Sequence, residues 1–154
     1  MERTLVILKP DAVNRVLVGK IIERFEGKGL KIAAMKLKHL DSQTLKVHYS
    51  HHKGKPFFDG LVKFMSSIPS VIMVLEGKDA VEVVRKMVGA TNGREALSGT
   101  IRGDLSMSAQ SNLVHASATT EEAKKEIERF FSKNEIFEYR KMNFEVIYSD
   151  DEKE

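Results

Sequence analysis

The stretch TLVIL, residues 4–8, is a run of β-branched and aliphatic residues that stops at Lys9-Pro10. Because proline has no N–H to donate to a neighbouring strand, this pattern predicts a buried strand with Lys9 at its end. A second such run, VIMVL at residues 71–75, predicts another central strand. Both runs are far shorter than the ~20 residues that cross a bilayer, so we expect no membrane anchor.

Amphipathic segments surround these two runs. Apolar residues recur at helical spacing over residues 17–25, which predicts a helix packed on the sheet and stopped by the glycines after it. Residues 30–40 alternate like a half-exposed strand, with a change of phase at Ala33-Ala34 that predicts a β-bulge. Further helices are predicted over residues 42–49, 57–65, 80–88 with Asp79 as cap, and 120–131 with Thr120 as cap.

The remaining segments show weaker hydrophobic periodicity. Leu113-Val114 predicts a short strand, and residues 144–148 predict a last extended piece. Residues 89–103 are rich in Gly, Thr, Asn and Ser, so we expect a functional loop that a ligand or a neighbouring subunit must order. The economical architecture is an α+β sandwich with helices over one antiparallel sheet. We expect one domain, residues 1–148, and an acidic tail, residues 149–154.

Composition excludes several classes of function. The chain has no cysteine, which rules out disulfides, thiolate metal sites and a cysteine nucleophile. Together with the lack of an apolar N-terminal segment, this favours a cytoplasmic protein. The net charge is +3, and the acidic tail hides a slightly more basic body whose natural partners are anions. Nucleic acid is compatible with this charge but is not required by it.

Several residues are candidates for binding a triphosphate. The charge of a triphosphate is spread over many oxygens, so its binding needs donors from several directions. Neither the Walker spacing nor the Gly-x-Gly-x-x-Gly fingerprint occurs in the chain. Each candidate donor, taken alone, is more commonly a solvated surface group. The candidates are Lys9, Arg85, Thr91, Asn92, Thr100 and Arg102.

His115 follows an apolar pair and precedes small residues. A histidine nucleophile needs one free ring nitrogen and an acceptor for the proton on the other nitrogen. Glu126, at the border of the apolar face of the last long helix, is a suitable acceptor. The plain alternative, a core or surface histidine beside an ordinary helix charge, is the commoner case on these facts alone. His48, His51 and His52 have no acidic or thiol ligand at regular spacing, so we predict no protein-bound metal.

Phe57 and Leu61 could offer an apolar face to a nucleobase. The alternative is that both Phe57 and its neighbour Phe58 belong to the core. Helical spacing from Phe57 to Phe64 predicts that at least one ring packs inward. If these apolar groups are the only contacts to a base, purines and pyrimidines should differ by about tenfold or so, because every base has a face that can stack.

Five ordered motifs resemble those of the nucleoside diphosphate kinases, and the resemblance runs from Thr4 to about Tyr148. The motifs are TLVILKPD at 4–11, HY at 48–49 with KPFFDGLV at 55–62, GATN at 89–92, GTIRGD at 99–104 and NLVHAS at 112–117. The resemblance implies a ferredoxin-like sandwich, a four-stranded antiparallel sheet covered by helices. It also implies a ping-pong reaction in which His115 takes the γ-phosphoryl group of a nucleoside triphosphate such as ATP and passes it to a diphosphate.

The same resemblance assigns the other residues of the site. Glu126 would orient the histidine, with the hydroxyl of Ser117 nearby, and Phe57 would stack on the base beside Leu61. Mg²⁺ would arrive on the nucleotide phosphates rather than in a protein cage. A homo-oligomer is implied, with a hexamer favoured over a tetramer. The phosphates, the sugar and the surroundings of the histidine would be held by Lys9, Tyr49, Arg85, Thr91, Arg102 and Asn112.

The chain departs from the family pattern at four positions. Ala116 and Ala118 stand where the family usually has Gly and Asp, although Ala116 keeps its N–H for a phosphate unless the site requires a positive φ. Gly93 and Ser98 stand where many members have proline, which should make the loop costlier to order. Gly93→Pro is therefore expected to stabilise the assembly if the local φ permits.

The competing class is a non-catalytic ferredoxin-like module that binds nucleotides or RNA, because fold alone does not separate the two. The RNA-recognition signature Lys/Arg-Gly-aromatic-Gly/Ala-Phe-Val is absent from every predicted strand. A binding module also has no need for His115 with Glu126. The sequence therefore favours the kinase.

Overall fold

In the computed structural model, which describes residues 1–153, the strands form one four-stranded antiparallel sheet in the order β2-β3-β1-β4. The two apolar runs are its central strands, and they pair from Glu2 opposite Gly77 to Leu8 opposite Val71. The register of β2 against β3 shifts between Ile32 and Ala34, which confirms the predicted bulge. The strands are β1 (Glu2–Leu8), β2 (Lys31–Lys38), β3 (Ser70–Gly77) and β4 (Val114–Ala116).

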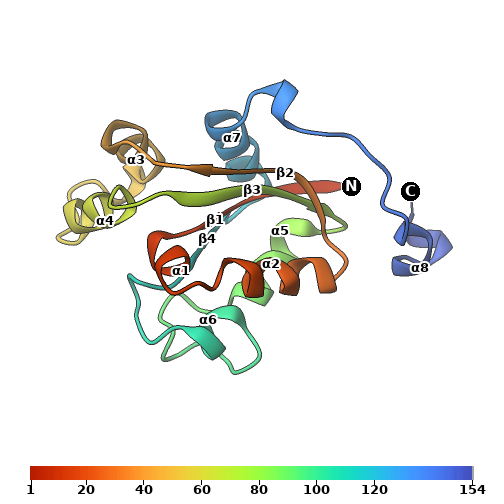
Figure 1. Cartoon of the computed structure of the whole chain (residues 1–154), viewed down its shortest axis with the longest axis horizontal. Coiled ribbons are helices and arrows are strands. Elements are labelled where there is room, and N and C mark those ends of the chain that lie inside the picture. The colour runs from red at the N-terminus through yellow and green to blue at the C-terminus, as the bar shows by residue number, and fades with distance from the viewer. Residues whose placement is uncertain (154) are drawn as a thin grey trace.

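Helices cover both faces of the sheet (Figure 1). One apolar core lies between the sheet and α3, α4 and α7, and the other lies against α1, α2, α5 and α6. None of the described helices is long and apolar enough to span a membrane. The helices are α1 (Pro10–Asn14), α2 (Val18–Gly27), α3 (Ser42–His48), α4 (Phe58–Met65), α5 (Ala80–Val88), α6 (Ile101–Leu105), α7 (Thr120–Phe130) and α8 (Phe144–Ile147), with short 3-10 turns at Ser50–His52, Lys133–Glu135 and Asp150–Glu152.

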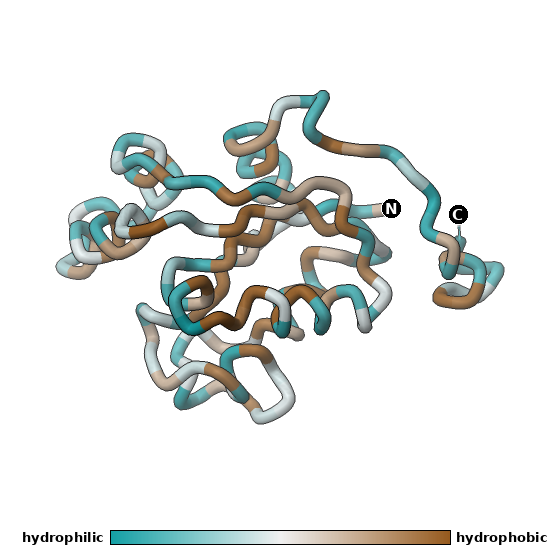
Figure 2. The backbone as a smooth tube through the Cα atoms, in the orientation of Figure 1, coloured by the Kyte–Doolittle hydropathy of each residue, from teal (hydrophilic) through white to brown (hydrophobic). Residues whose placement is uncertain are grey.

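β1 is buried on both faces, as its unbroken apolar run predicts. Leu5 and Ile7 belong to the core under α7, whereas Val6 and Leu8 belong to the core under α2 and α5. The hydropathy along the backbone shows the same concentration of hydrophobic residues in the central strands (Figure 2). The end of β1 therefore lies between two packed layers, and Lys9 is held there with only 6% of its surface exposed.

The cap predicted for α5 is wrong. Asp79 occupies the N-cap position, but its φ is 50° and its side chain makes no capping hydrogen bond. The carboxylate of Glu2 caps the helix instead: its Oε2 accepts the N–H of Val81 at 2.9 Å. A local pattern at the start of the helix could not reveal a cap supplied by the first strand.

The cap predicted for α7 is displaced by one residue. Thr119 is the N-cap, and its hydroxyl accepts the N–H of Glu122 at 3.1 Å. The hydroxyl of Thr120 instead donates to Oε1 of Glu2 at 2.6 Å. Glu2 therefore ties together the starts of α5 and α7, two helices that carry residues of the candidate site.

Residues 89–103 are held by contacts within their own chain, contrary to the expectation that a ligand or neighbour must order them. Arg102 donates to the carbonyl of Gly89 at 2.9 Å, and the N–H of Gly99 donates to Asp104 at 2.7 Å. The segment also runs into α6, whose five residues are too few to show helical periodicity. Thr100 caps this helix by accepting the N–H of Gly103 at 3.0 Å.

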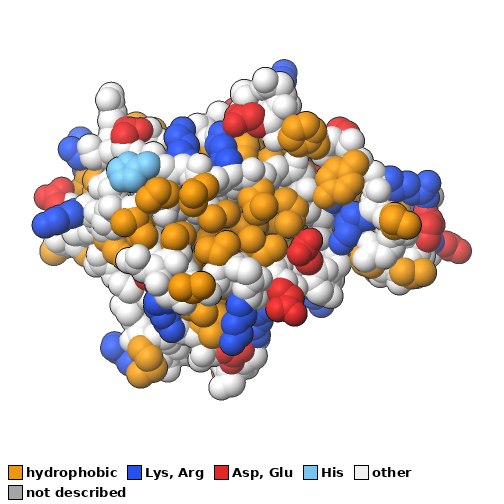
Figure 3. All heavy atoms as spheres, viewed as in Figure 1, with side chains coloured by type: hydrophobic (Ala, Val, Ile, Leu, Met, Phe, Trp, Pro, Cys, Tyr) orange, Lys and Arg blue, Asp and Glu red, His pale blue; other side chains and the backbone are white. Residues whose placement is uncertain are grey.

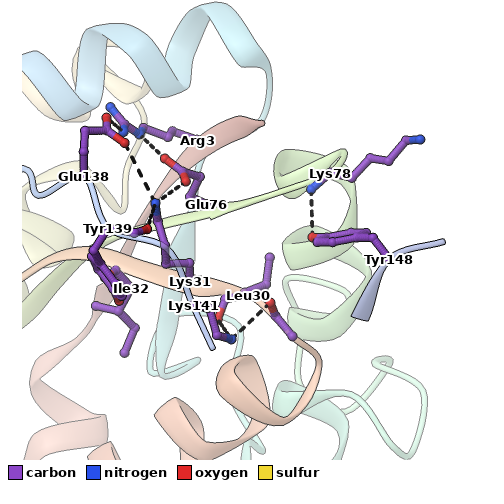
Figure 4. Close-up of polar contacts among 11 residues, drawn as sticks. Arg3, Leu30, Lys31, Ile32, Glu76, Lys78, Glu138, Tyr139, Lys141 and Tyr148 are labelled. Atoms are coloured by element: carbon purple, nitrogen blue, oxygen red, sulfur yellow. Dashed lines mark hydrogen bonds and ion pairs between the residues drawn. The ribbon is translucent and has the colours of Figure 1, made fainter. Parts of the chain in front are cut away.

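Residues 144–148, predicted as an extended piece, form the short helix α8 instead. The chain reaches this helix by running back past the end of the sheet (Figure 4). There the ammonium of Lys141 donates to the carbonyl of Leu30 at 3.2 Å, and the N–H of Lys78 donates to the Tyr148 hydroxyl at 3.2 Å. The predicted tail begins at Ser149, and its last residue, Glu154, lies outside the described residues.

Candidate active site

A cavity of about 620 Å³ opens where β1 ends and β4 begins, between α4 and the loop after α5. Ser117 lies behind this cavity, whereas two predicted phosphate donors lie elsewhere. Asn92 pairs with Glu95 at 2.8 Å, and Thr100 caps α6. The lining of the cavity includes all ten other residues that the sequence singled out for the site, namely Lys9, Tyr49, Phe57, Leu61, Arg85, Thr91, Arg102, Asn112, His115 and Glu126.

The sheet brings His115 and Glu126 together. His115 pairs with Ile7 across β1 and β4, so its side chain shares the face that α7 covers. Its Nε2 lies 3.0 Å from Oε1 of Glu126. The other carboxylate oxygen accepts the hydroxyl of Ser117 at 2.6 Å, and this hydroxyl in turn accepts the N–H of Leu5 at 3.2 Å. Glu126 is therefore fixed at both oxygens.

The surroundings of Glu126 keep it ionised. Burial alone would raise the pKa of this carboxyl, but the hydrogen bonds from His115 and Ser117 and the nearby charge of Arg129 bring it below its ordinary value. An ionised carboxylate at Nε2 holds the proton on that nitrogen and leaves the lone pair of Nδ1 available. This is the arrangement that a histidine nucleophile requires.

The backbone before His115 is strained and tightly held. Leu113 is fully buried with a φ of 71°, and the N–H of Val114 donates to the carbonyl of Asn112 at 2.8 Å, which closes a γ-turn. Both polar groups of Leu113 are bound: its N–H donates to Asp11 at 3.0 Å and its carbonyl accepts the N–H of Lys9 at 2.8 Å. The sequence did not single out Asp11, because it lies 102 residues away from its partner.

Ala116 does not conflict with this geometry. The residues other than glycine with left-handed φ among those described are Val16, Asp79 and Leu113. Ala116 instead lies in the extended strand β4, opposite Val6. The site therefore does not need the positive φ that would favour glycine at this position.

A buried cation, Lys9, and a half-buried one, Arg102, face the cavity without an ion-pair partner among the described residues. Lys9 donates to the amide oxygen of Asn112 at 2.6 Å, and burial followed by the charge of Arg102 lowers its pKa to about 8. Arg102 donates to three main-chain carbonyls, and burial followed by the charge of Arg85 lowers its pKa to about 10. Cations that lack a direct ion-pair partner are suited to an anionic ligand.

His48 lies beside the pair formed by His115 and Glu126, which the sequence did not lead us to expect. Its ring lies edge-on to His115 with centroids 4.5 Å apart, and burial followed by the charge of His115 lowers its pKa to about 2. Arg129 donates to its Nδ1 at 3.1 Å. His48 is therefore a neutral, buried ring that packs against His115. In the sequence, only its place before Tyr49 in the HY motif associated His48 with this site.

His48, His115 and Glu126 form a set of donors that could in principle hold a metal ion, since one ligand atom from each lies within 4.8 Å of the others. The structure thus supplies the acidic partner that the sequence pattern of the histidines lacked. Arg129 already occupies Nδ1 of His48, and Lys9 faces the same cavity. This surplus of positive charge favours an anion over a cation.

The outer end of the cavity is apolar. Phe57 is 45% exposed and lines the cavity, whereas Phe58 packs into the core, so the alternative in which both rings are buried is wrong. The hydroxyl of Tyr49 is buried without a hydrogen-bond partner among the described residues, and burial raises its pKa. Ala109 and Gln110 also line the cavity, although no pattern in the sequence marked them.

Comparison with known proteins agrees with this geometry. A family model described as nucleoside diphosphate kinase matches residues 2–136. A nucleoside diphosphate kinase of Thermoplasma volcanium is 56% identical over 96% of this chain and 100% of its own length, and one of Parabacteroides distasonis is 51% identical over 99% of both chains.

Solved structures are similar over the same length. A halophilic nucleoside diphosphate kinase from Halobacterium salinarum in complex with CDP superimposes with a TM-score of 0.94, at 42% identity over 96% of this chain and 99% of that one. The ferredoxin-like fold predicted from the motifs is thereby confirmed. The chain belongs to the nucleoside diphosphate kinase family.

Proposed function

We propose that this enzyme transfers the γ-phosphoryl group of a nucleoside triphosphate to a nucleoside diphosphate through His115. The pairing of His115 with Glu126 at 3.0 Å is the observation that carries the assignment of the nucleophile. The magnesium complex of the nucleotide is the substrate, because the cavity offers cations rather than a carboxylate cage.

In the first half-reaction, the Nδ1 lone pair attacks the γ-phosphorus and a P–N bond forms. The bond from phosphorus to the bridging oxygen breaks, and the diphosphate leaves with that electron pair. Glu126 stabilises the positive charge that develops on the imidazole while it keeps the proton on Nε2. In the second half-reaction, a β-phosphate oxygen of another diphosphate attacks the phosphohistidine, and the imidazole leaves as the neutral ring.

Lys9 and Arg102 stabilise the charge that spreads over the transferring group. Tyr49, Arg85, Thr91 and Asn112 position the remaining phosphates and the sugar, with Asn112 also fixing Lys9 at 2.6 Å. Phe57 stacks on the base beside Leu61. Replacing Lys9 or Arg102 by alanine should cost roughly 2–4 kcal/mol of transition-state stabilisation, the scale of one preorganised donor.

A binding module is the weaker alternative. Binding alone needs no carboxylate fixed at both oxygens behind an imidazole, and Glu126 is fixed in this way by His115 and Ser117. Burying a carboxylate is costly unless it is paired and hydrogen-bonded, and the partners that offset this cost for Glu126 are the candidate nucleophile and its neighbour Ser117. The described site therefore supports catalysis rather than binding alone.

A two-step incubation tests the proposal. Wild-type protein mixed with ATP and Mg²⁺ should release ADP and keep the phosphoryl group, and the isolated phosphoprotein should convert added GDP to GTP. His115→Ala should abolish both steps, whereas His39→Ala, at an exposed histidine outside the cavity, should leave them intact. Transfer that needs ATP and GDP present together, with no isolable phosphoprotein, would contradict the ping-pong route.

We further propose a homo-oligomer, a hexamer in preference to a tetramer, that works in the cytoplasm. Apolar side chains gather in the middle of the face in Figure 3. On β2, an edge strand of the sheet, Met35 and Leu37 are 53% and 65% exposed. An exposed apolar edge strand is suited to cover by another copy of the chain. The division into a domain, residues 1–148, and a solvated tail, residues 149–154, stays a prediction.

A further inference from the structure

The side chain of Gln110 lies at the outer, apolar end of the cavity. Its Nε2 is 3.8 Å from the position that a Cβ on Gly60 would occupy, and Gly60 sits on α4 between Phe57 and Leu61. Gln110 itself lines the cavity and is exposed. Its carboxamide makes no hydrogen bond within residues 1–153, whereas both of its main-chain polar groups are bound.

The backbone that carries this carboxamide is fixed. The N–H of Gln110 donates to the hydroxyl of Ser108 at 3.2 Å, and its carbonyl accepts the ammonium of Lys9 at 3.4 Å. The amide of Asn112 donates to the carbonyl of Ala109 at 2.8 Å. One residue therefore touches Lys9 with its main chain and reaches the wall beside Phe57 with its side chain, so it spans the cavity from the phosphate end to the base end.

We propose that Gln110 is a base-binding residue that hydrogen-bonds the edge of the nucleobase stacked on Phe57. This inference rests on the proposed function, which places the base at that end. A carboxamide offers a donor and an acceptor side by side, and a half-turn of its last torsion exchanges them. It can therefore pair with a base that presents an amino group and equally with one that presents a carbonyl.

Two other polar groups near Phe57, Lys55 and His52, are engaged with each other. The ammonium of Lys55 lies 3.1 Å from Nδ1 of His52, and the His52 ring packs against Phe57 with centroids 5.1 Å apart. The carboxamide of Gln110 is neutral and without a partner among the described residues, so pairing with a base breaks no hydrogen bond within the protein. Gln110 thus adds affinity for every base, and the weak selectivity expected from stacking is preserved.

The test removes the donor and keeps the acceptor. In Gln110→Glu, an amino base still finds an acceptor, but the carbonyl of a keto base meets a carboxylate. The ratio of the dissociation constants for GDP and UDP over those for ADP and CDP, measured by calorimetry, should rise about three- to tenfold, the range of one neutral hydrogen bond. Gln110→Met, of similar length, should weaken all four diphosphates to a similar extent.

Gln43→Glu is the matched control, because it makes the same charge change at an exposed position on α3, outside the cavity. Its ratio should equal that of the wild type. An unchanged ratio in Gln110→Glu, or unchanged affinities in Gln110→Met, would overturn the inference. Both readouts are equilibrium binding, so they judge Gln110 whether or not the protein forms a phosphohistidine, and the two-step incubation judges the proposed function separately.

Discussion

Lys9 is buried, and its protonation state depends on the other residues of the site. Its ammonium has Asn112 and the carbonyl of Gln110 as partners, and Arg102 as a positive neighbour. Burial and this neighbour lower its pKa to about 8, against an ordinary value of 10.5. A phosphate oxygen would supply the counter-charge that is otherwise lacking, so binding of a nucleotide and protonation of Lys9 favour each other.

The value of kcat/KM for nucleotides should therefore fall as the pH rises through about 8. The sign follows from the lowered pKa: above that pH the free enzyme has a neutral amine where the phosphate needs an ammonium, and kcat/KM reports the free enzyme. Initial rates between pH 6.5 and 9.5, in roughly half-unit steps, would measure the profile.

Lys9→Arg is the control, because a guanidinium stays protonated over this range, so its residual activity should lose the descending limb. A wild-type kcat/KM that stays flat through pH 9 would contradict this account of Lys9, as would an arginine variant with the same descending limb as the wild type.

Ten residues that the sequence singled out line the candidate cavity, and their roles stay predictions. Lys9, Phe57, His115 and Glu126 were singled out from strand ends, helical spacing and small neighbours, and the motifs added Tyr49 and Asn112. Asp11 and Gln110 were not found. Their roles depend on where the loop before β4 crosses the end of β1, and no local pattern encodes a contact between segments about 100 residues apart in the chain.

At the level of elements, prediction succeeded where burial alone decides the structure. The two central strands, the bulge in β2 and the long amphipathic helices are set by hydrophobic periodicity. The caps of α5 and α7 were misassigned because Glu2, on a different element, bonds to both helix starts. α8 was misassigned because four residues cannot show whether their period is helical or extended.

The loop after α5 gives a prediction that reverses the sequence-based expectation for Gly93→Pro. The N–H of Gly93 donates to the carbonyl of Ser108 at 3.2 Å, and a Cβ there would lie 2.4 Å from the carbonyl oxygen of Ser106. Proline would remove the hydrogen bond and force the two segments apart. We expect Gly93→Pro to lower the free energy of unfolding by at least about 1–3 kcal/mol, measured by urea denaturation.

Ser98→Pro is the matched comparison in the same loop. Ser98 is exposed, its φ is not positive, and its N–H donates to no main-chain or side-chain acceptor among the described residues. Proline there should leave stability unchanged or raise it by about 0.4–1 kcal/mol. If Gly93→Pro proved as stable as the wild type, the packing of this loop against residues 106–108 would be refuted.

At the scale of the whole molecule, the exposed apolar edge at β2 makes assembly measurable. We expect light scattering to give six times 17.4 kDa for the wild type. Leu37→Lys should lower the mass, because a charge would replace an exposed apolar side chain on the edge strand. Val16→Lys, at a residue that is 88% exposed outside that strand, is the comparison and should keep the wild-type mass.

The urea dependence of the mass belongs to the same prediction. Contacts between subunits should loosen at modest urea, before the far-ultraviolet circular dichroism of the folded chain is lost. A wild-type protein that stays monomeric and fully active at micromolar concentration would contradict the oligomer. If the Leu37→Lys variant kept the wild-type mass, β2 would not be part of the interface between subunits.

Glu126 holds Nε2 of His115, and we propose that Nδ1 therefore takes the phosphoryl group. The most direct measurement is phosphorus and nitrogen NMR on protein with ¹⁵N-labelled histidine after reaction with ATP and Mg²⁺, which identifies the nitrogen that carries the phosphorus. We expect an acid-labile, base-stable phosphohistidine with the phosphoryl group on Nδ1 of His115. Phosphorus on Nε2, on another residue, or retained in His115→Ala would contradict it.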